Sequence, residues 1–569
     1  MKKTLFFIFL CVGVLGAEAS KNWLNDFQSM QSTNVLKKSY LAGILSGQSY
    51  GKYSVDSLYS PSLVKEFYKK RDYETYWITG NFDLNSNLFG LIDAIDDAYK
   101  IGLDSRSYHQ SEISEILSDI KNRNLFTKKD KNLAIGKLDI LLTDLFFTLS
   151  KDVREGSLDY YKFNRMLKNK SEAEEVNYTW TTSKKKMDYI SFLDKAVSMN
   201  DMKKAIYSLQ PDNQIYQKLK NAYIKYQAIE ASGGWQKIPD GKTLKLGVVD
   251  GNRVPILTER LYKTGDLLQY DPFLIKVTPE VSDAIKNFQK RVGLRPSGVL
   301  NRSTRNALNI PVEVRLRQIK LNLERSRWES QNFGDNYILI NIPDFRMNFI
   351  RNENSELSMR VVVGTKKNPT PIFQSKMSYF VVNPTWTVPS SIVLKEMLTK
   401  LQDDPDYLST RKFKMYSDWS KDRKEIDSFD IDWYAYTEDS KLPYSFVREP
   451  GKGNPLGSVK FIFPNRHAVY MHDTPSKKYF KRNIRAFSHG CIRLAQPQKL
   501  LELLSNNFTD LDYANIKKIQ KSAENKSIPL SDKIPVYIRY YTAWSDENGN
   551  VSFRNDIYGY DALQYKILN

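Results

Sequence analysis

Cysteine is almost absent from this 569-residue chain, which contains only Cys11 and Cys491. Cys11 lies in a leader-like N-terminus, so we expect Cys491 to be the one thiol left after processing and no intramolecular disulfide to form. An unpaired thiol is a liability in an oxidising compartment unless it is buried or chemically needed. Cys491 is therefore either a buried structural cysteine or a nucleophile. The residues around it in the sequence distinguish these two roles.

Long apolar runs are also missing beyond the N-terminus. Residues 1–19 begin with lysines, continue with an apolar run and end in Ala-Glu-Ala before Ser20, which is typical of a secretory signal peptide. The best later run, 138–149, is interrupted by Asp139 and Asp144, so we expect no membrane span. These features predict an exported protein that is tethered to the membrane only if the leader stays uncut.

Acidic residues are fewer than basic ones, 65 against 85, which gives a net charge of +20. In an exported protein this excess favours an anionic surface or polymer as partner over nucleic acid, with solvated lysine-rich faces as the alternative. The basic residues form no compact cluster, and no nucleic-acid-binding motif is present. A hydrophobic content of 41% excludes global disorder, and the length predicts two to four domains.

Apolar spacing predicts a multidomain α+β chain with a helical first part. Residues 20–240 show helical periodicity, most strongly over 138–149, and indicate a scaffold domain in which His109 is expected at the surface. Residues 243–310 predict a module of three short helices, one of them capped by Thr278. A basic amphipathic helix over residues 311–335 is expected to link this module to the next domain.

From residue 336 the apolar period becomes two, which predicts a β-rich domain over 336–500. Residues 394–445 are charged and aromatic and interrupt this rhythm, so they indicate an insertion, either a lid over a cleft or a packed surface excursion. Residues 501–569 are expected to form a C-terminal extension that packs on the β-rich domain.

Three of the four histidines lie close to Cys491 in the sequence, and each could activate its thiol. His472 is expected at a strand end, His489 lies two residues before Cys491, and His467, at a turn, is the weakest candidate. Gly490 and the backbone N–H groups around it could hold an oxyanion. Arg493 could lower the pKa of the thiol or bind a substrate carboxylate.

The motifs HDTP and FSHGCIRL, with NPTWTVP upstream, resemble the YkuD-type L,D-transpeptidase catalytic domain, in its large periplasmic YcbB-like branch. The run FQKRVGLRPSGVLNRSTRNALN resembles a three-helix peptidoglycan-binding module, for which a bare helical spacer is the alternative. The resemblance implies Cys491 as nucleophile, His472 as general base and acid, and Ser488 and His489 as residues that shape the site. Residues two apart on a turn seldom meet in hydrogen-bonding geometry, which also favours the distant His472.

Two aromatic residues complete the predicted site. Tyr470 lies two residues before His472 on the expected strand, so it should face the same way and line the cleft. Trp386 is expected as a conformational anchor near the cleft, with a plain core tryptophan as the alternative.

The resemblance implies a periplasmic enzyme of cell-wall biogenesis that forms 3→3 peptidoglycan crosslinks through a cysteine thioester. Its partners would be donor and acceptor stem peptides, with other wall-synthesis proteins possible, and no metal or cofactor is implied. Water as acceptor would make an L,D-carboxypeptidase instead, and a lipoprotein lysine or a D-amino acid are further acceptors. A non-catalytic wall-binding scaffold is the most distant alternative.

Overall fold

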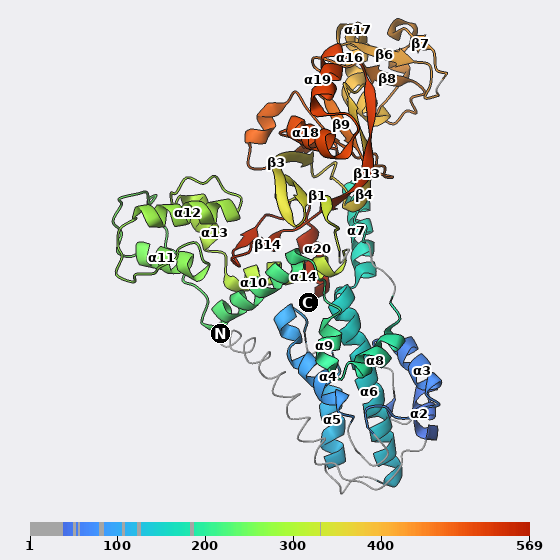
Figure 1. Ribbon diagram of the computed structural model, residues 1–569, viewed down its shortest axis with the longest axis vertical. Coiled ribbons are helices and arrows are strands. Elements are labelled where there is room, and N and C mark those ends of the chain that lie inside the picture. The colour runs from blue at the N-terminus through green and yellow to red at the C-terminus, as the bar shows by residue number, and fades with distance from the viewer. Residues whose placement is uncertain are drawn as a thin grey trace.

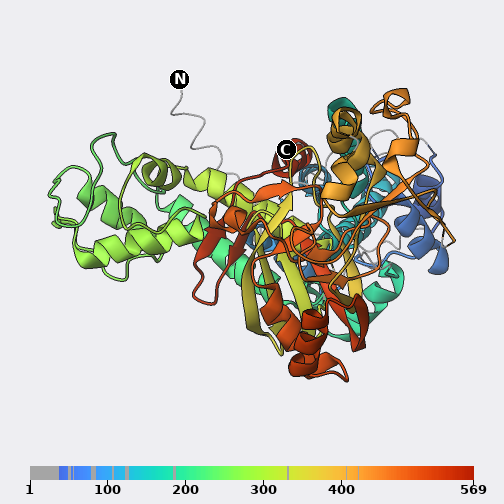
Figure 2. The same ribbon diagram turned by 90° about the horizontal axis from the view of Figure 1, so that it is seen from above.

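The computed structural model of the protein describes residues 38–48, 53–54, 57–78, 85–104, 108–121, 127–182, 187–329, 332–404, 406–420 and 422–568. The predicted signal peptide and Cys11 lie outside these residues. The predicted multidomain α+β architecture is confirmed: a helical region, a smaller helical module and a β-rich domain with an extra sheet surround one helix, α14 (Val312–Arg327) (Figures 1 and 2). Among the described helices, none is both long and apolar enough to cross a membrane.

The helical region is built around the 28-residue α6, which begins with a capping box formed by Thr127 and Asp130. Two of its aspartates, Asp139 and Asp144, are buried and hold neighbouring loops: Asp139 accepts from the Tyr76 N–H at 2.7 Å, and Asp144 from the Ser60 N–H at 2.7 Å. The helices of this region are α2 (Lys38–Leu45), α3 (Pro61–Lys70), α4 (Asn87–Asp96), η2 (Ala98–Ile101), α5 (Gln110–Lys121), α6 (Lys128–Glu155), α7 (Tyr160–Glu174), α8 (Tyr189–Ser198), α9 (Met202–Tyr207) and α10 (Gln214–Ala231).

His109 is buried in this region, so the expectation of a surface position is wrong. Its Nε2 lies 2.7 Å from Oδ2 of Asp144, and its Nδ1 lies 3.5 Å from Oε2 of Glu112. Two carboxylates around one imidazole explain the burial, because together they satisfy both ring nitrogens.

The smaller module contains α11 (Val254–Lys263), α12 (Pro279–Arg291) and α13 (Arg302–Leu308) around its own apolar core. As expected, the Thr278 side chain accepts from the Val281 N–H and Pro279 occupies the first turn of α12. The module projects to one side of the molecule in both views (Figures 1 and 2).

Nine strands form the main sheet, in the order β11-β3-β12-β10-β9-β4-β13-β1-β2, and β2 also pairs with β3, so the sheet closes into a barrel. The strands are β1 (Asn336–Asn341), β2 (Arg346–Arg351), β3 (Asn354–Gly364), β4 (Phe373–Val382), β9 (Val459–Ile462), β10 (Met471–His472), β11 (Ala486–Ser488), β12 (Ile492–Leu494) and β13 (Lys526–Arg539). The helices η8 (Lys477–Lys481), α18 (Pro497–Phe508) and α19 (Tyr513–Ser522) lie between strands in the sequence.

Two segments outside the expected β-rich domain belong to this barrel. Strand β13, from the expected C-terminal extension, is an inner strand between β4 and β1. Residues 158–180, from the expected scaffold, place Phe163 and Trp180 in the barrel's apolar core, and Thr181 donates its N–H to the carbonyl of Ile372 at 2.9 Å. Apolar periodicity reveals a strand or a helix, but not the partner that it pairs with.

The insertion carries a four-stranded sheet, in the order β5-β8-β6-β7, with its own apolar cluster. Its elements are β5 (Trp386–Val388), α15 (Ser390–Ile392), the π-helical turn η5 (Val393–Met397), α16 (Leu398–Asp403), α17 (Tyr407–Thr410), β6 (Phe413–Tyr416), β7 (Glu425–Ile426), η6 (Ser428–Asp430), η7 (Trp433–Ala435) and β8 (Ser445–Arg448). It forms the end of the molecule opposite the helical region (Figure 1).

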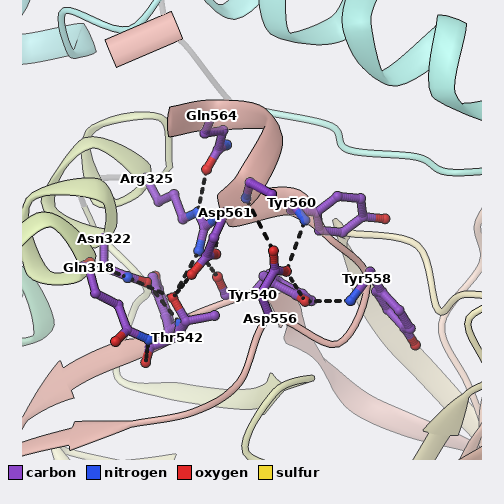
Figure 3. A network of polar contacts seen from close by, with 12 residues as sticks. Gln318, Asn322, Arg325, Tyr540, Thr542, Asp556, Tyr558, Tyr560, Asp561 and Gln564 are labelled. Atoms are coloured by element: carbon purple, nitrogen blue, oxygen red, sulfur yellow. Dashed lines mark hydrogen bonds and ion pairs between the residues drawn. The ribbon is translucent and has the colours of Figure 1, made fainter. Parts of the chain in front are cut away.

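Helix α14 is buried along most of its surface, so it is a central element of the fold and not an exposed linker. Its Arg325 donates to Asp561 at 2.6 Å, to Gln564 at 2.8 Å and to the carbonyl of Tyr540 at 3.1 Å. Figure 3 shows this guanidinium pointing toward α20 (Tyr560–Leu568). The same C-terminal segment contains the hairpin β14 (Ala543–Ser545) and β15 (Val551–Phe553).

Arg325→Met is expected to lower the free energy of unfolding by about 3–5 kcal/mol, because it leaves the buried carboxylate of Asp561 without its cation. Denaturant titration followed by tryptophan fluorescence measures the change. Arg317→Met, at an exposed position of the same helix, is the matched control and should change little. Equal effects of the two substitutions would contradict a structural role for the buried pair.

Candidate active site

The candidate active site lies where β10 and β12 run side by side. The two strands are parallel, with Met471 opposite Ile492 and His472 opposite Arg493. Met471 and Ile492 are fully buried and face the barrel core. Because side chains alternate along a strand, His472 and Arg493 must face the other way, and Tyr470 and Cys491, one position outside each strand, face the same way as they do.

The thiol of Cys491 is unpaired and lies beside Tyr470. Sγ donates to the carbonyl of Ala468 at 3.8 Å. Burial raises the pKa of the Cys491 thiol, although the backbone N–H and hydroxyl of Tyr470 and the charge of Arg493 act to lower it. At neutral pH the resting nucleophile is therefore the thiol and not the thiolate.

His472 is buried and held in one tautomer. Its Nδ1 lies 2.5 Å from the backbone oxygen of Asp473, and because a carbonyl can only accept, Nδ1 carries the proton and Nε2 is free to act as a base. The Asp473 carboxylate is in turn held by the Ser458 N–H at 3.0 Å and by Lys477 at 2.5 Å. Burial, and next the charge of Arg493, lower the pKa of His472 to about 4, so its imidazole is neutral at pH 7.

The loop before Cys491 is closed by Ser488. Its buried hydroxyl donates to the carbonyl of Cys491 at 2.6 Å and accepts from the Gly490 N–H at 3.2 Å. The Gly490 N–H is thus already engaged, and the predicted oxyanion hole is reduced to the N–H of Cys491. Gly490 has φ +113°, a region that side chains rarely adopt, so glycine is needed here for backbone conformation.

The other predicted residues are spread around this centre. His489 is half exposed, and its Nε2 lies 2.6 Å from Oε1 of Glu396 in η5, which connects the SHGC motif to the insertion. Trp386 lies in β5, with its ring 6.2 Å from that of Phe413, so it is grouped with the insertion's sheet and not with β10 and β12. His467 packs beside Phe373 at a ring distance of 5.0 Å.

Lys460 is a site residue that sequence reasoning missed. Strand β9 places it opposite His472, and its Nζ lies 5.9 Å from the centre of the Tyr470 ring. Burial lowers the pKa of Lys460. On the other side of His472, the buried Nε of Arg493 has no hydrogen-bond partner within the described residues. Two cations therefore flank the imidazole, and only the strand register could have revealed the second.

Comparisons with known proteins agree with this geometry. Residues 335–534 match the L,D-transpeptidase catalytic domain (YkuD), residues 62–222 match a scaffold domain, and residues 250–308 match the "Putative peptidoglycan binding domain". A Haemophilus influenzae protein named "Putative L,D-transpeptidase" is 36% identical over 228 residues, which cover 40% of this chain and 45% of that relative. The match thus spans less than half the length of the relative.

Solved structures give weaker similarities. The L,D-transpeptidase (Yku) from Stackebrandtia nassauensis is 13% identical, with 53% of this chain and 97% of that chain covered and a TM-score of 0.21. The L,D-transpeptidase from Mycobacterium smegmatis is 12% identical, with 36% and 58% covered and a TM-score of 0.16. Scores this low do not establish a shared fold.

His472, in β10, and Cys491, one residue before β12, thus face the same way inside a matched catalytic domain, which defines an L,D-transpeptidase-domain enzyme. More particularly, the chain combines the YkuD catalytic domain with a scaffold domain and a peptidoglycan-binding domain. The YkuD-type catalytic domain predicted from the HDTP and FSHGCIRL motifs is confirmed over residues 335–534.

Alkylation of Cys491 by iodoacetamide is expected to be slow at pH 7 and to rise about tenfold per pH unit until the pH approaches the raised pKa of this thiol, because only the thiolate reacts. Arg493→Gln should move the curve to higher pH, since it removes a cation that lowers the pKa. Mass spectrometry measures the rates, with Cys491→Ala as the blank. A plateau below pH 8 would show that the free enzyme holds a thiolate.

Proposed function

We propose that this protein is an L,D-transpeptidase that forms 3→3 crosslinks between peptidoglycan stem peptides. The observation that carries the proposal is the strand pair that brings a thiol at Cys491 and an unprotonated His472 to one face of the matched catalytic domain. An intact nucleophile and base argue against a non-catalytic scaffold.

In the first half-reaction Cys491 Sγ attacks the carbonyl of the third residue of a tetrapeptide donor, for which we propose meso-diaminopimelate. His472 Nε2 takes the thiol proton as the S–C bond forms and gives it to the D-Ala amine as the C–N bond breaks. Starting from two neutral groups, this proton transfer must accompany the attack, because neither partner is ionised beforehand. The products are a thioester and free D-Ala.

In the second half-reaction the amine of an acceptor stem attacks the thioester carbonyl. The new amide bond forms, the C–S bond breaks, and His472 carries the proton from the amine to the leaving sulfur. Water in place of the amine gives an L,D-carboxypeptidase, and a lipoprotein lysine or a D-amino acid gives other transfer products. We favour the stem amine because the chain also contains a peptidoglycan-binding domain, which concentrates acceptor stems near the site.

The charges around the site suit an anionic substrate. Lys460 and Arg493 flank His472, and we propose that they bind the terminal carboxylate of the donor's D-Ala, next to the scissile bond. In the binding module, a cleft of about 550 Å³ also carries three cations. Its lining residues are Lys237, Asp240, Arg302, Arg305, Asn306 and Asn309. An extracytoplasmic location, in the periplasm beside the wall, follows from this substrate.

Incubation of the purified protein with disaccharide tetrapeptides is expected to release D-Ala and yield 3→3 dimers, resolved by chromatography and mass spectrometry. His472→Ala should slow acylation by at least about 10²-fold, because it removes the proton acceptor. His489→Ala should be milder, since this side chain faces Glu396.

Cys491→Ala is the blank, and a carbapenem serves as an independent acylating probe that adds its mass to the wild type. Tripeptide without dimers would instead assign a carboxypeptidase. If the wild type gave neither a carbapenem adduct nor a crosslinked product, the proposed enzymatic function would be refuted. If His489→Ala slowed acylation more than His472→Ala, His489 and not His472 would be the general base.

Lys460→Gln is expected to raise KM for a tetrapeptide donor about tenfold, because a charge-assisted hydrogen bond to the terminal carboxylate is lost. The matched donor with a C-terminal amide should have the same KM with the wild type and the variant. Lys376→Gln, on the neighbouring strand β4 and exposed, is the control. Equal losses for acid and amide donors would contradict carboxylate binding by Lys460.

A further inference from the structure

The peptide group between Gly490 and Cys491 is anchored from outside the catalytic motif. Thr370, in the loop between β3 and β4, is fully buried, and its hydroxyl donates to the carbonyl of Gly490 at 2.8 Å. The same hydroxyl accepts from the N–H of Gly364 at 2.9 Å. One buried hydroxyl therefore connects the end of β3 to the residue before the nucleophile.

Thr370 is itself held by Tyr558, which lies between β15 and α20. The buried Tyr558 hydroxyl donates to the carbonyl of Gly364 at 2.7 Å and accepts from the N–H of Thr370 at 3.2 Å. Its own N–H donates to the hydroxyl of Tyr540 at 2.9 Å (Figure 3). The anchor is thus part of the buried network that ends at Arg325.

The loop geometry makes an anchor necessary. A Cβ at Gly364 would lie 2.0 Å from the backbone oxygen of Asn368, so the loop that carries Thr370 folds tightly back on β3 and has little freedom. Gly490, by contrast, has φ +113° and no side chain to limit its rotation. Ser488 binds the groups on either side, the Gly490 N–H and the Cys491 carbonyl, but not the peptide between them.

A peptide group is planar, and its C=O and N–H point in opposite directions in the trans form. A hydrogen bond that fixes the Gly490 carbonyl therefore also fixes the direction of the Cys491 N–H. This N–H is the oxyanion donor that remains, because the Gly490 N–H is bound to Ser488. Donors of this kind accelerate reaction only when they already point at the developing oxyanion.

We infer that Thr370, held by Tyr558, is a positioning residue that aims the N–H of Cys491 at the oxyanion of the tetrahedral intermediate. The inference rests on the proposed acyl transfer. Neither residue touches the substrate, and neither alters the thiol itself, which contacts Tyr470 and Ala468.

Two reactions of the same sulfur separate positioning from folding. Acylation by a carbapenem passes through an oxyanion, whereas alkylation by iodoacetamide does not. Thr370→Val is expected to lower the acylation rate by about tenfold to a hundredfold and to leave the alkylation rate within about twofold of wild type. Because an unfolded chain would be alkylated but not acylated, far-UV circular dichroism checks that each variant is folded before its two rates are compared on one sample by mass spectrometry.

The conservative variant Thr370→Ser keeps the hydroxyl and should restore most of the ratio. Tyr558→Phe should lower the ratio by a smaller factor, since it loosens Thr370 without removing its hydroxyl. Tyr560→Phe is the matched control: this tyrosine is buried in the same aromatic cluster, but its hydroxyl has no partner within the described residues, so the ratio should not change.

An unchanged ratio in Thr370→Val, or an equal loss in Thr370→Ser, would overturn the inference. So would equal effects of Tyr558→Phe and Tyr560→Phe. Failure of the wild type to acylate while it alkylates normally would instead refute the proposed function, so the two failures are distinguishable.

Discussion

The charged residues buried on α14 require partners, and those partners come from the helical region and from the C-terminal segment. Glu324 accepts from the Leu158 N–H, Arg327 donates to the carbonyl of Ile101 and to Tyr216, and Arg325 pairs with Asp561. An unpaired charge at these positions would cost several kcal/mol. The helical region, α14 and the C-terminal segment can therefore separate only by exposing these charged groups or leaving them without partners. This constraint holds the three parts together beneath the barrel.

Within the barrel, the register of β10 and β12 brings the candidate catalytic groups together. A thiol and an imidazole from residues nineteen positions apart are brought to one face of the sheet by adjacent parallel strands. Burial keeps the imidazole of His472 and the thiol of Cys491 neutral, so they form no ion pair before the substrate reacts. In the proposed reaction, charge develops only during attack, where fixed donors and the flanking cations would stabilise it most effectively.

The candidate catalytic motif could be predicted from the sequence because it is local: Ser488 to Arg493 is one short stretch, and His472 precedes it on a recognisable strand. Apolar periodicity also predicted some of the helices, such as α6 and α12, and most strands of the barrel. The sequence could not reveal Lys460, Thr370 or Tyr558, whose importance depends on pairing between strands and loops far apart in the chain. The sequence prediction misplaced His109 and treated α14 as a basic amphipathic linker helix, because buried polar residues look like surface residues until their partners are known.

The position of β13 in the sheet determines when the barrel can close during folding. This strand is supplied by residues 526–539 and lies between β4 and β1, which come from residues 373–382 and 336–341, far earlier in the sequence. A chain that is still emerging from a ribosome or an export channel has β1 and β4 but lacks the strand that joins them. The barrel stays open until residues 526–539 have emerged, so the thiol acquires its active-site environment only after the domains that precede it can fold.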